Sequence, residues 1–530
     1  MKLNIKDILQ KVASDIVNHP AVQKLLEIIA NQSKKIEELE EEIRRLKCIP
    51  GKPNIKPSGV EKNNMSNRTN PKDKRPGSEK RSKTKEKKDF QDIIIEPENV
   101  QKDWKFKDYN DYHVQELELR VINLRFKLKT YITPEGDYKV GKLPKEYEGT
   151  HFGPVIHQYI IHQYHHCRVT EPLLLEQLHE IGLDISAGTL NEIICGKEIF
   201  HIEKEELLQT GISLSDYIQS DDTGARHKGK NGYCTVIANE YFTYFKSCDT
   251  KSRINFLEIL RTSNYEDYCI NQYALDYMRA QGMPRKYLFI FEFLRGCIYV
   301  NKTEWELKLE ELEIKVDYAK RIATEGALVG SLMEHEINKN IAVISDDAGQ
   351  FNILQHGLCW IHAERNIQKI HCFTDEHEKL LEDKLKELWQ FYKELKTYKL
   401  QPCVQKKEEL EKKFNDIFQT PTGFFSLDQA LEKVVQNKDE LLLVLNRPEI
   451  PLHNNTSERD IREYVIKRKI SGSTRSDHGR SARDTFASLK KTCRKLNISF
   501  WKYLEDRFTL KNEIPNLAES LAKKLTVQLE

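Results

Sequence analysis

The chain has 530 residues, of which 39% are hydrophobic and 31% charged, enough for several folded domains with unusually polar surfaces. Lys and Arg number 84 and Asp and Glu 82, giving a formal net charge of +2. This balance excludes a uniformly basic histone-like protein and a solvating acidic chain, so any nucleic-acid surface must be a local patch.

Neither the apolar segments nor the cysteines indicate export. No run of 18 or more apolar residues is present, and the first residues lack the apolar core of a signal peptide. The 11 cysteines are scattered and form no C-x-x-C unit, which is typical of reduced thiols. We therefore expect a cytoplasmic protein without membrane association.

Residues 1–48 are predicted to be a helical segment, and residues 21–47 within it carry a seven-residue repeat. The core positions of the repeat hold Leu25, Ile29, Gln32, Ile36, Leu39, Ile43 and Leu46. Isoleucine at one core position and leucine at the other favours two parallel strands of a coiled coil. We expect a homodimer or higher oligomer through residues 21–47, and the alternative is one amphipathic helix packed on its own chain.

Two segments of different character follow the helix. Residues 49–90 are predicted to be a disordered basic linker, because residues 51–90 hold 13 Lys and Arg against 5 Asp and Glu and almost no large apolar side chains. The linker would act as a spacer or bind DNA phosphates without sequence preference. Residues 91–150 alternate apolar and charged side chains around a turn signal at 134–137, which predicts a small β-rich module.

Residues 151–205 are predicted to be helical and to contain a helix-turn-helix. Two helical runs meet at Gly182, and Thr170 and Ser186 stand where their N-caps are expected. The second helix, at about 187–195, would enter a major groove of DNA. It has few Lys or Arg residues, however, and any helical hairpin shows the same pattern.

From residue 213 onward, short apolar strands alternate with helices. Strands are expected from Tyr217 to Asp221, as a hairpin around Asn239, and at 341–345. Residues 213–505 are therefore predicted to form one α/β domain within a multidomain α/β chain. Its helical insertions are expected at about 264–335 and 374–445, and residues 506–530 are expected to form a C-terminal tail helix.

Three acidic residues stand out by their positions. Asp221 and Asp346 each end a predicted strand, and Glu458 lies in the first turn of a predicted helix. Carboxylates from adjacent strand ends and a nearby helix can hold two divalent metals about 4 Å apart, and such ligands suit Mg²⁺ or Mn²⁺. Each residue also has a structural interpretation, since Asp is common in turns and Glu458 fits a helix cap with Asn455.

Basic residues cluster after Glu458. The predicted DNA-binding residues are Arg459, Arg462, Lys467, Arg468, Lys469 and Arg475. A carboxylate among such cations suits a metal site that grips a phosphate backbone, and a solvated helix face is the alternative.

Histidines and cysteines near the second aspartate do not predict a zinc site. Cys359, His362, His371 and Cys372 are of the right residue types, but their spacing is a poor match to the usual zinc sites. We expect instead that a helix places Cys359 and His362 near the acidic residues.

The blocks around these acidic residues resemble the insertion sequence 66 family of bacterial transposases, which carry an Asp-Asp-Glu catalytic domain. The matching blocks are residues 220–226, 345–351, 357–365 and 454–459, in the order found in the family. Two departures are visible: residues 91–150 lack the cysteines of a zinc module that many relatives carry, and the segment at about 264–335 is long.

The resemblance implies a ribonuclease-H-like core that cuts at the ends of a mobile element and joins the 3′-ends to target DNA. It assigns Asp221, Asp346 and Glu458 as catalytic residues and ligands of two Mg²⁺ or Mn²⁺ ions. It implies supporting roles for the neighbouring residues Asp222, Asp347, His362 and Arg365.

We therefore expect a DNA transposase, associated with the bacterial nucleoid, that acts on terminal inverted repeats and target DNA. The resemblance also implies small accessory proteins of the element as partners. Two alternatives stay open: a metal-dependent DNA nuclease of the same fold that joins no strands, and a non-catalytic DNA-binding protein descended from a transposase.

Overall fold

The computed structural model describes residues 19–46, 91–98, 105–335 and 338–526. It divides into one unit of residues 29–119 and another of residues 1–28 with 120–530, and each is described by itself. The predicted basic linker at 49–90 lies outside the described residues. None of the described helices is long and apolar enough to cross a membrane.

The predicted N-terminal helix is present as α3, Pro20–Leu46. Two of its repeat positions, Leu25 and Ile29, are exposed to solvent at 61% and 38%. An exposed apolar stripe of this kind is compatible with pairing, which stays a prediction.

The prediction of a β-rich module at 91–150 is largely wrong for the residues that the structure describes. The strands found there are β1 (Thr130–Ile132) and β2 (Tyr138–Val140), an antiparallel ribbon around the predicted turn. The alternating stretches at 117–121 and 124–128 form no strands, and most of their apolar side chains are exposed. Alternation makes a strand only where a neighbouring strand and a packed face are available. A short 3-10 turn, η1 (Lys145–Tyr147), follows.

The region 151–205 is helical as predicted. Its elements are α5 (Pro154–Ile161), the π-helical turn η2 (His162–His166), α6 (Glu171–Glu180), α7 (Ala187–Cys195) and the start of α8 (Glu198–Leu214). Gly182, with φ +86°, turns the chain between α6 and α7. Ser186 caps α7 by accepting from the backbone N–H of Thr189, whereas Thr170 occupies the N-cap of α6 without a side-chain bond.

A five-stranded mixed sheet forms the centre of the main domain, with strand order β5-β4-β3-β8-β9. Its strands are β3 (Tyr217–Gly224), β4 (Tyr233–Ala238), β5 (Thr243–Cys248), β8 (Ala342–Ser345) and β9 (Gln355–Leu358). The first three pair antiparallel, while β8 pairs parallel with both β3 and β9. The predicted hairpin around Asn239 and the strand at 341–345 are confirmed, but β3 continues past Asp221 to Gly224.

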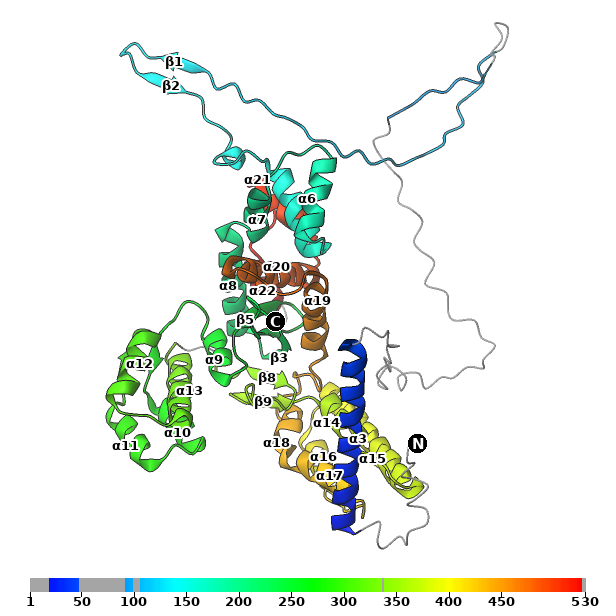
Figure 1. Ribbon diagram of the computed structural model, residues 1–530, viewed down its shortest axis with the longest axis vertical. Helices are drawn as coiled ribbons and strands as arrows, with labels where there is room; N and C mark the ends of the chain where they lie inside the picture. Colours follow the sequence, from blue (N-terminus) through cyan, green and yellow to red (C-terminus); the bar gives the residue numbers. More distant parts are fainter. Residues whose placement is uncertain (1–18, 47–90, 99–104, 336–337, 527–530) are drawn as a thin grey trace. The chain divides into compact units, whose positions relative to one another are not determined.

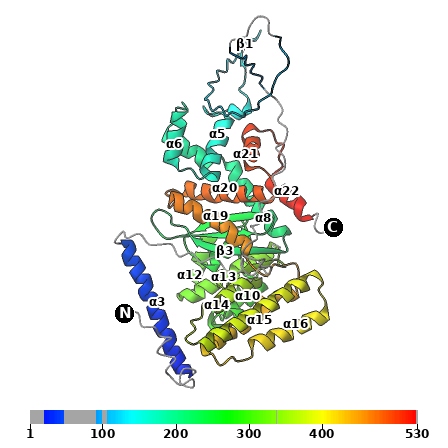
Figure 2. The same cartoon turned by 90° about the vertical axis from the view of Figure 1, so that its right-hand side faces the viewer.

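Helices α19 (Asn455–Ser471) and α20 (Asp477–Lys495) cover one face of this sheet (Figure 2). Ile461 and Tyr464 of α19 pack on Val236 and Phe245 of the sheet. The N-cap of α19 is Asn454 and not Asn455 as predicted, so Glu458 lies one position deeper in the helix. Helix α9 (Arg253–Arg261) follows β5.

Both predicted insertions are helical and lie well apart in Figure 1. The first comprises α10 (Gln272–Ala280), α11 (Arg285–Phe293), α12 (Lys302–Glu311) and α13 (Asp317–Glu334), with a two-stranded ribbon of β6 (Tyr268–Cys269) and β7 (Ile298–Tyr299). The second follows α14 (Trp360–Gln368) and comprises α15 (Asp375–Leu400), α16 (Val404–Phe418), α17 (Phe425–Gln436), α18 (Lys438–Leu441) and η3 (Leu443–Leu445). Helices of the second insertion share a hydrophobic core with β8 and β9, which ties them to the sheet.

The C-terminal region contains two helices, α21 (Phe500–Thr509) and α22 (Leu517–Thr526). Helix α21 crosses the predicted boundary at 505, and α22 packs on α8. The C-terminal helix is therefore part of the fold's core and not a separate tail.

Candidate active site

The sheet brings the two predicted aspartates together. Strands β3 and β8 run parallel, with Ile218 opposite Val343 and Gln219 opposite Ile344. Continuing this register by two residues sets Asp221 beside Asp346, which directly follows β8. The pairing of β3 with β8 thus brings together two aspartates that lie 125 positions apart in the sequence.

Strand alternation separates Asp221 from its neighbour Asp222. Successive side chains of a strand point to opposite faces, so Gln219, Asp221 and Thr223 share one face. Gln219 and Thr223 both contact α19: the Gln219 Oε1 accepts from the backbone N–H of Thr456 at 2.9 Å, and Arg468 donates to Thr223 at 3.3 Å. The face that holds Asp221 is therefore the face that α19 covers.

Asp222 lies on the other face and its oxygens are already engaged. Thr235 donates to its Oδ1 at 2.5 Å, Gln350 donates to its Oδ2 at 2.9 Å, and the Lys251 ammonium lies 4.0 Å from Oδ2. Burial raises the pKa of Asp222, and these donors oppose the rise. Asp222 thus fits the supporting position predicted for it.

The second aspartate pair divides in the same way. The Asp346 Oδ1 accepts from the backbone N–H of Ala348 at 3.2 Å, and the Asp346 charge acts on both Asp221 and His362. Asp347 instead forms an ion pair with Lys433 of α17 at 2.6 Å. Asp346 therefore belongs with Asp221, and Asp347 belongs to the neighbouring helical insertion.

Glu458 joins the aspartates because Gln219 anchors the start of α19. The Gln219 side chain, 1% exposed, accepts from the N–H groups of Thr456 and Ser457, at 2.9 and 3.3 Å. These two N–H groups are among those that a helix N-terminus leaves without partners. Gln219 thus fixes the first turn of α19, and with it Glu458, over the face that holds Asp221.

Two side chains of α14, one guanidinium and one imidazole, lie against Glu458. The Arg365 Nη1 lies 3.4 Å and the His362 Nε2 3.6 Å from its Oε1. Burial lowers the pKa of His362, and the charges of Glu458 and Asp346 oppose the decrease. The predicted supporting role of both residues therefore has a geometric basis.

Asp221 is the least compensated carboxylate of the three. Its pKa is raised to about 7, first by burial and then by the negative charges of Asp346, Glu458 and Asp222, with a backbone hydrogen bond opposing. Its Oδ1 accepts only the N–H of Asp222, at 2.7 Å, and it forms no ion pair within the described residues. Asp221, Asp346 and Glu458 together form an acidic junction. The protein supplies too little positive charge there to balance the three carboxylates.

Comparison with known proteins establishes the family. A family profile described as "Transposase IS66 family" matches residues 342–482, a segment that includes Asp346 and Glu458. A relative from Sinorhizobium fredii (strain NBRC 101917 / NGR234), described as "Uncharacterized protein y4jO", is 42% identical over 322 residues, which is 60% of this chain and 100% of the relative. The chain belongs to the IS66 family of transposases.

A buried hydrogen-bond relay supports Asp346 in this IS66 transposase. The Ser345 hydroxyl donates to the carbonyl of Asp346 at 2.7 Å and lies 2.8 Å from the His356 Nε2. The His356 Nδ1 lies 2.8 Å from Glu440 of α18. The two ring nitrogens of His356 thus join Ser345 of the strand end to Glu440. Through this relay, Glu440 of the second insertion helps to fix the backbone at Asp346.

Most of the predicted DNA-binding residues of the transposase are exposed on or after α19. Arg459, Arg462, Lys469 and Arg475 are exposed, and Arg468 is half-buried against β3. Lys467 differs: it is 7% exposed, donates to the carbonyl of Tyr164 at 2.7 Å, and its pKa is lowered to about 7 by burial and neighbouring cations. Since it lies three residues after the buried Tyr464, it faces the protein interior and not DNA.

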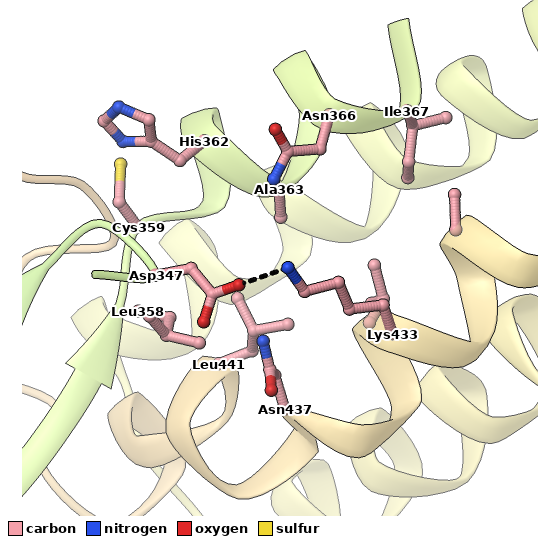
Figure 3. A pocket seen from close by; sticks show the side chains of 12 residues that line it. Asp347, Leu358, Cys359, His362, Ala363, Asn366, Ile367, Lys433, Asn437 and Leu441 are labelled. Atoms are coloured by element: carbon pink, nitrogen blue, oxygen red, sulfur yellow. Dashed lines mark ion pairs between the residues drawn. The ribbon is translucent and has the colours of Figure 1, made fainter. Parts of the chain in front are cut away.

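A pocket of about 70 Å³ opens beside the junction (Figure 3). Residues of α14, α17 and the strand end at Leu358 line it, and they include His362 and Asp347. Across the described part of the chain, no three His, Cys, Asp or Glu side chains converge closely enough to enclose a metal ion. At the junction, the Glu458 carboxylate is turned toward Arg365 and His362, and therefore it does not converge with the two aspartates.

Gln219, Ser345, His356 and Glu440 were not among the predicted site residues. Gln219 could have been found, because it stands two positions before Asp221 and must share its face of the strand. The His356 relay had no local signal, since Glu440 lies 84 positions away along the chain.

Proposed function

We propose that this IS66 transposase cuts DNA at the ends of its element and transfers the 3′-ends to target DNA by a metal-dependent Asp-Asp-Glu mechanism. The observation that supports the proposal is the acidic junction, where three separate elements set Asp221, Asp346 and Glu458 within one another's electrostatic reach. The second aspartate and the glutamate lie within the segment that matches the family profile.

The residues of the junction fit two Mg²⁺ or Mn²⁺ ions. All three are hard oxygen ligands. The raised pKa of Asp221 reflects burial first and repulsion by the neighbouring carboxylates second, and a divalent cation would relieve that repulsion. When bound, such ions activate the attacking oxygen and stabilise the leaving oxygen of a displacement at phosphorus. Without metal, Arg365 and His362 hold the Glu458 carboxylate. Metal binding would turn this carboxylate away from them and toward the two aspartates.

The exposed cations on and after α19 would position the DNA. Arg462 and Lys469 lie four and eleven residues after Glu458, so they share its side of the helix. Contacts of this kind to phosphates set the register of DNA without reading its sequence. Sequence reading is assigned to the helical pair α6 and α7, whose Gly182 turn and capped second helix suit entry into a major groove.

Pairing of two chains through α3 would bring two element ends together. The exposed repeat positions Leu25 and Ile29 supply the start of the apolar seam. Sedimentation equilibrium of the full chain should give a dimer or larger assembly, and Leu25→Glu with Ile29→Glu should shift it toward monomer. A wild-type monomer at micromolar concentration would contradict the pairing.

Cleavage and joining assays with labelled element ends in Mg²⁺ test the mechanism. Wild type should cut and join, whereas Asp221→Asn, Asp346→Asn and Glu458→Gln should bind DNA and do neither. Cutting without joining would favour a nuclease of the same fold. Binding without cutting by wild type would favour a non-catalytic DNA-binding protein or the need for an accessory protein of the element.

A further inference from the structure

Residues 116–129, which lead directly into β1 and are called the arm below, expose a series of apolar side chains. None of these residues lies in a helix or strand of the described chain, and Figure 1 shows the chain entering β1 in an extended form. A contiguous apolar series at the surface of a protein marks a site of association. The apolar side chains of the arm that are between 42% and 76% exposed are Leu117, Leu119, Ile122, Leu124, Phe126 and Leu128.

The order of side chains in the arm complements itself. When two copies of the arm run antiparallel with Val121 of one opposite Ile122 of the other, residues at equal distances from this pair face each other. Cross-strand pairs of side chains are what stabilises such a ribbon, and a second copy of the chain therefore fits the apolar pattern. The apolar pairs in this register are Val121 with Ile122, Leu119 with Leu124 and Leu117 with Phe126.

The charged side chains agree with the same register. Both acidic residues of the arm stand opposite basic residues, Glu116 opposite Lys127 and Glu118 opposite Arg125. The two-fold symmetry of the pair repeats each of these contacts, and opposite charges across a ribbon stabilise it. A register shifted by two residues also pairs apolar side chains, but it sets Arg120 opposite Arg125. Charge therefore selects the first register.

Folding of the arm on itself is the alternative to pairing with a second copy. A hairpin of residues 117–128 would use Ile122 and Asn123 as its two turn residues, and the turns that suit such short loops require positive φ at one or both of them. Neither residue is among the described residues with positive φ, which a β-branched residue such as Ile122 adopts only with strain. The arm instead continues into the ribbon of β1 and β2, where the Lys129 carbonyl accepts from the Gly141 N–H at 2.9 Å.

We propose that the arms of two copies pair antiparallel, with Val121 opposite Ile122, and form a β-ribbon between the chains. This contact is distinct from the pairing through α3 and does not depend on the metal mechanism. It explains why a segment with the alternation of a strand forms no strand within one chain, since its partner strand belongs to a second copy. A two-stranded ribbon is only marginally stable by itself, so the pairing is tested in the full chain, where any second contact raises the local concentration of the arms.

Disulfide formation between different chains tests the register. Leu119→Cys and Leu124→Cys are co-expressed in separate full-length chains of different size, which excludes a bond within one chain. Mild oxidation should join the two chains through the introduced thiols, as located by mass spectrometry of the peptides. Leu119→Cys with Arg125→Cys is the matched control and should react at least about fivefold more slowly, because adjacent side chains of a strand point to opposite faces. Equal rates, or no bond in either pair of chains, would overturn the pairing.

Charge reversal tests the pairing without introduced thiols. Glu116→Lys with Glu118→Lys should raise the dissociation constant of the full-length dimer at least about tenfold in sedimentation equilibrium, since the opposite-charge pairs become repulsive. Adding Lys127→Glu and Arg125→Glu exchanges the signs and should restore association, which a change in the folding of one chain would not do. A monomeric wild type, an unchanged dissociation constant, or an exchange that restores nothing would overturn the proposal.

The outcomes separate the arm from the proposed function. If the disulfide forms in the expected register but wild type neither cuts nor joins DNA, the pairing of the arms stands and the catalytic mechanism fails. If wild type cuts and joins while the disulfide and the charge exchange both fail, the arms do not pair and the catalytic mechanism stands.

Discussion

The acidic junction and the two aspartates that flank it show what turns a carboxylate into a candidate ligand. Asp222 and Asp347 are adjacent in sequence to Asp221 and Asp346, yet each has its own partners, in Thr235 and Gln350 for the first and Lys433 for the second. Asp221 has no cation within the described residues and keeps a raised pKa. The four aspartates are the same residue type. They differ in the direction of their side chains and in the partners that these side chains meet.

This difference suggests how to recognise such a site. A carboxylate whose hydrogen bonds and charges are satisfied by the fold contributes to stability and has little left to offer a metal. A carboxylate kept near others without a cation costs stability, and that cost is recovered only when a cation binds.

The largest effect is expected from substituting, one at a time, the two neighbouring aspartates of β3. Asp221→Asn removes a proposed ligand of the proposed metal site and should lower DNA cleavage by about 10³-fold, equivalent to several kcal/mol of transition-state stabilisation. Asp222→Asn should lower cleavage far less, while weakening the bonds to Thr235 and Gln350. Single-turnover cleavage rates, with binding measured in parallel, decide the comparison. Equal losses in both variants would show that the strand face does not separate their roles.

A smaller effect is expected from the relay behind Asp346. His356→Leu breaks both of its bonds and should reduce cleavage by roughly 10–100-fold, as loss of groups that orient ligands commonly does. The half-saturating Mg²⁺ concentration should rise as well, which simple loss of stability would not produce. His356→Gln retains a donor toward Ser345 and should recover part of the activity. An unchanged metal requirement in His356→Leu would contradict the relay.

Gln219 should have a moderate effect that divides between stability and activity. Gln219→Leu leaves the N–H groups of Thr456 and Ser457 without their acceptor, at a cost of about 1 kcal/mol in unfolding free energy. Cleavage should fall by about tenfold, because a shift of the first turn of α19 displaces Glu458. Gln219→Glu keeps an acceptor and should retain the stability in thermal unfolding. If Gln219→Leu loses stability but cuts normally, Gln219 caps the helix without positioning Glu458.

The smallest effect concerns stability alone and depends on pH. With its pKa raised to about 7, folded Asp221 binds its proton more tightly than the unfolded chain does, so unfolding free energy falls as pH rises from about 4 to 7. Asp221→Asn has no such proton, and relative to wild type it should gain of the order of 1 kcal/mol at pH 8 but not at pH 5. Thermal unfolding without metal measures this. Adding Mg²⁺ at pH 8 should stabilise wild type and not the variant. An equal pH response in both proteins would place Asp221 outside the repulsion.

Local sequence patterns were sufficient to predict most secondary-structure elements of this protein and the surroundings of its acidic residues. Periodicity and turn signals were enough for α3, the β4–β5 hairpin, β8, the helical pair at 171–195 and both insertions, because these features depend on neighbours within a few positions. The resemblance of short blocks to one family supplied the candidate trio.

Which faces these elements bury, and which partners they meet, depends on tertiary packing. The alternation at 117–128 produced no strand because no strand among the described residues pairs with it, whereas the alternation in β3 and β4 lies inside a sheet. Several features depend on residues more than 80 positions away: the bond from Gln350 to Asp222, the burial of Lys467, the Gln219 cap and the His356 relay. Local sequence sets secondary-structure propensity and the spacing of residues. The partners that a side chain meets are set only when distant segments of the chain pack together.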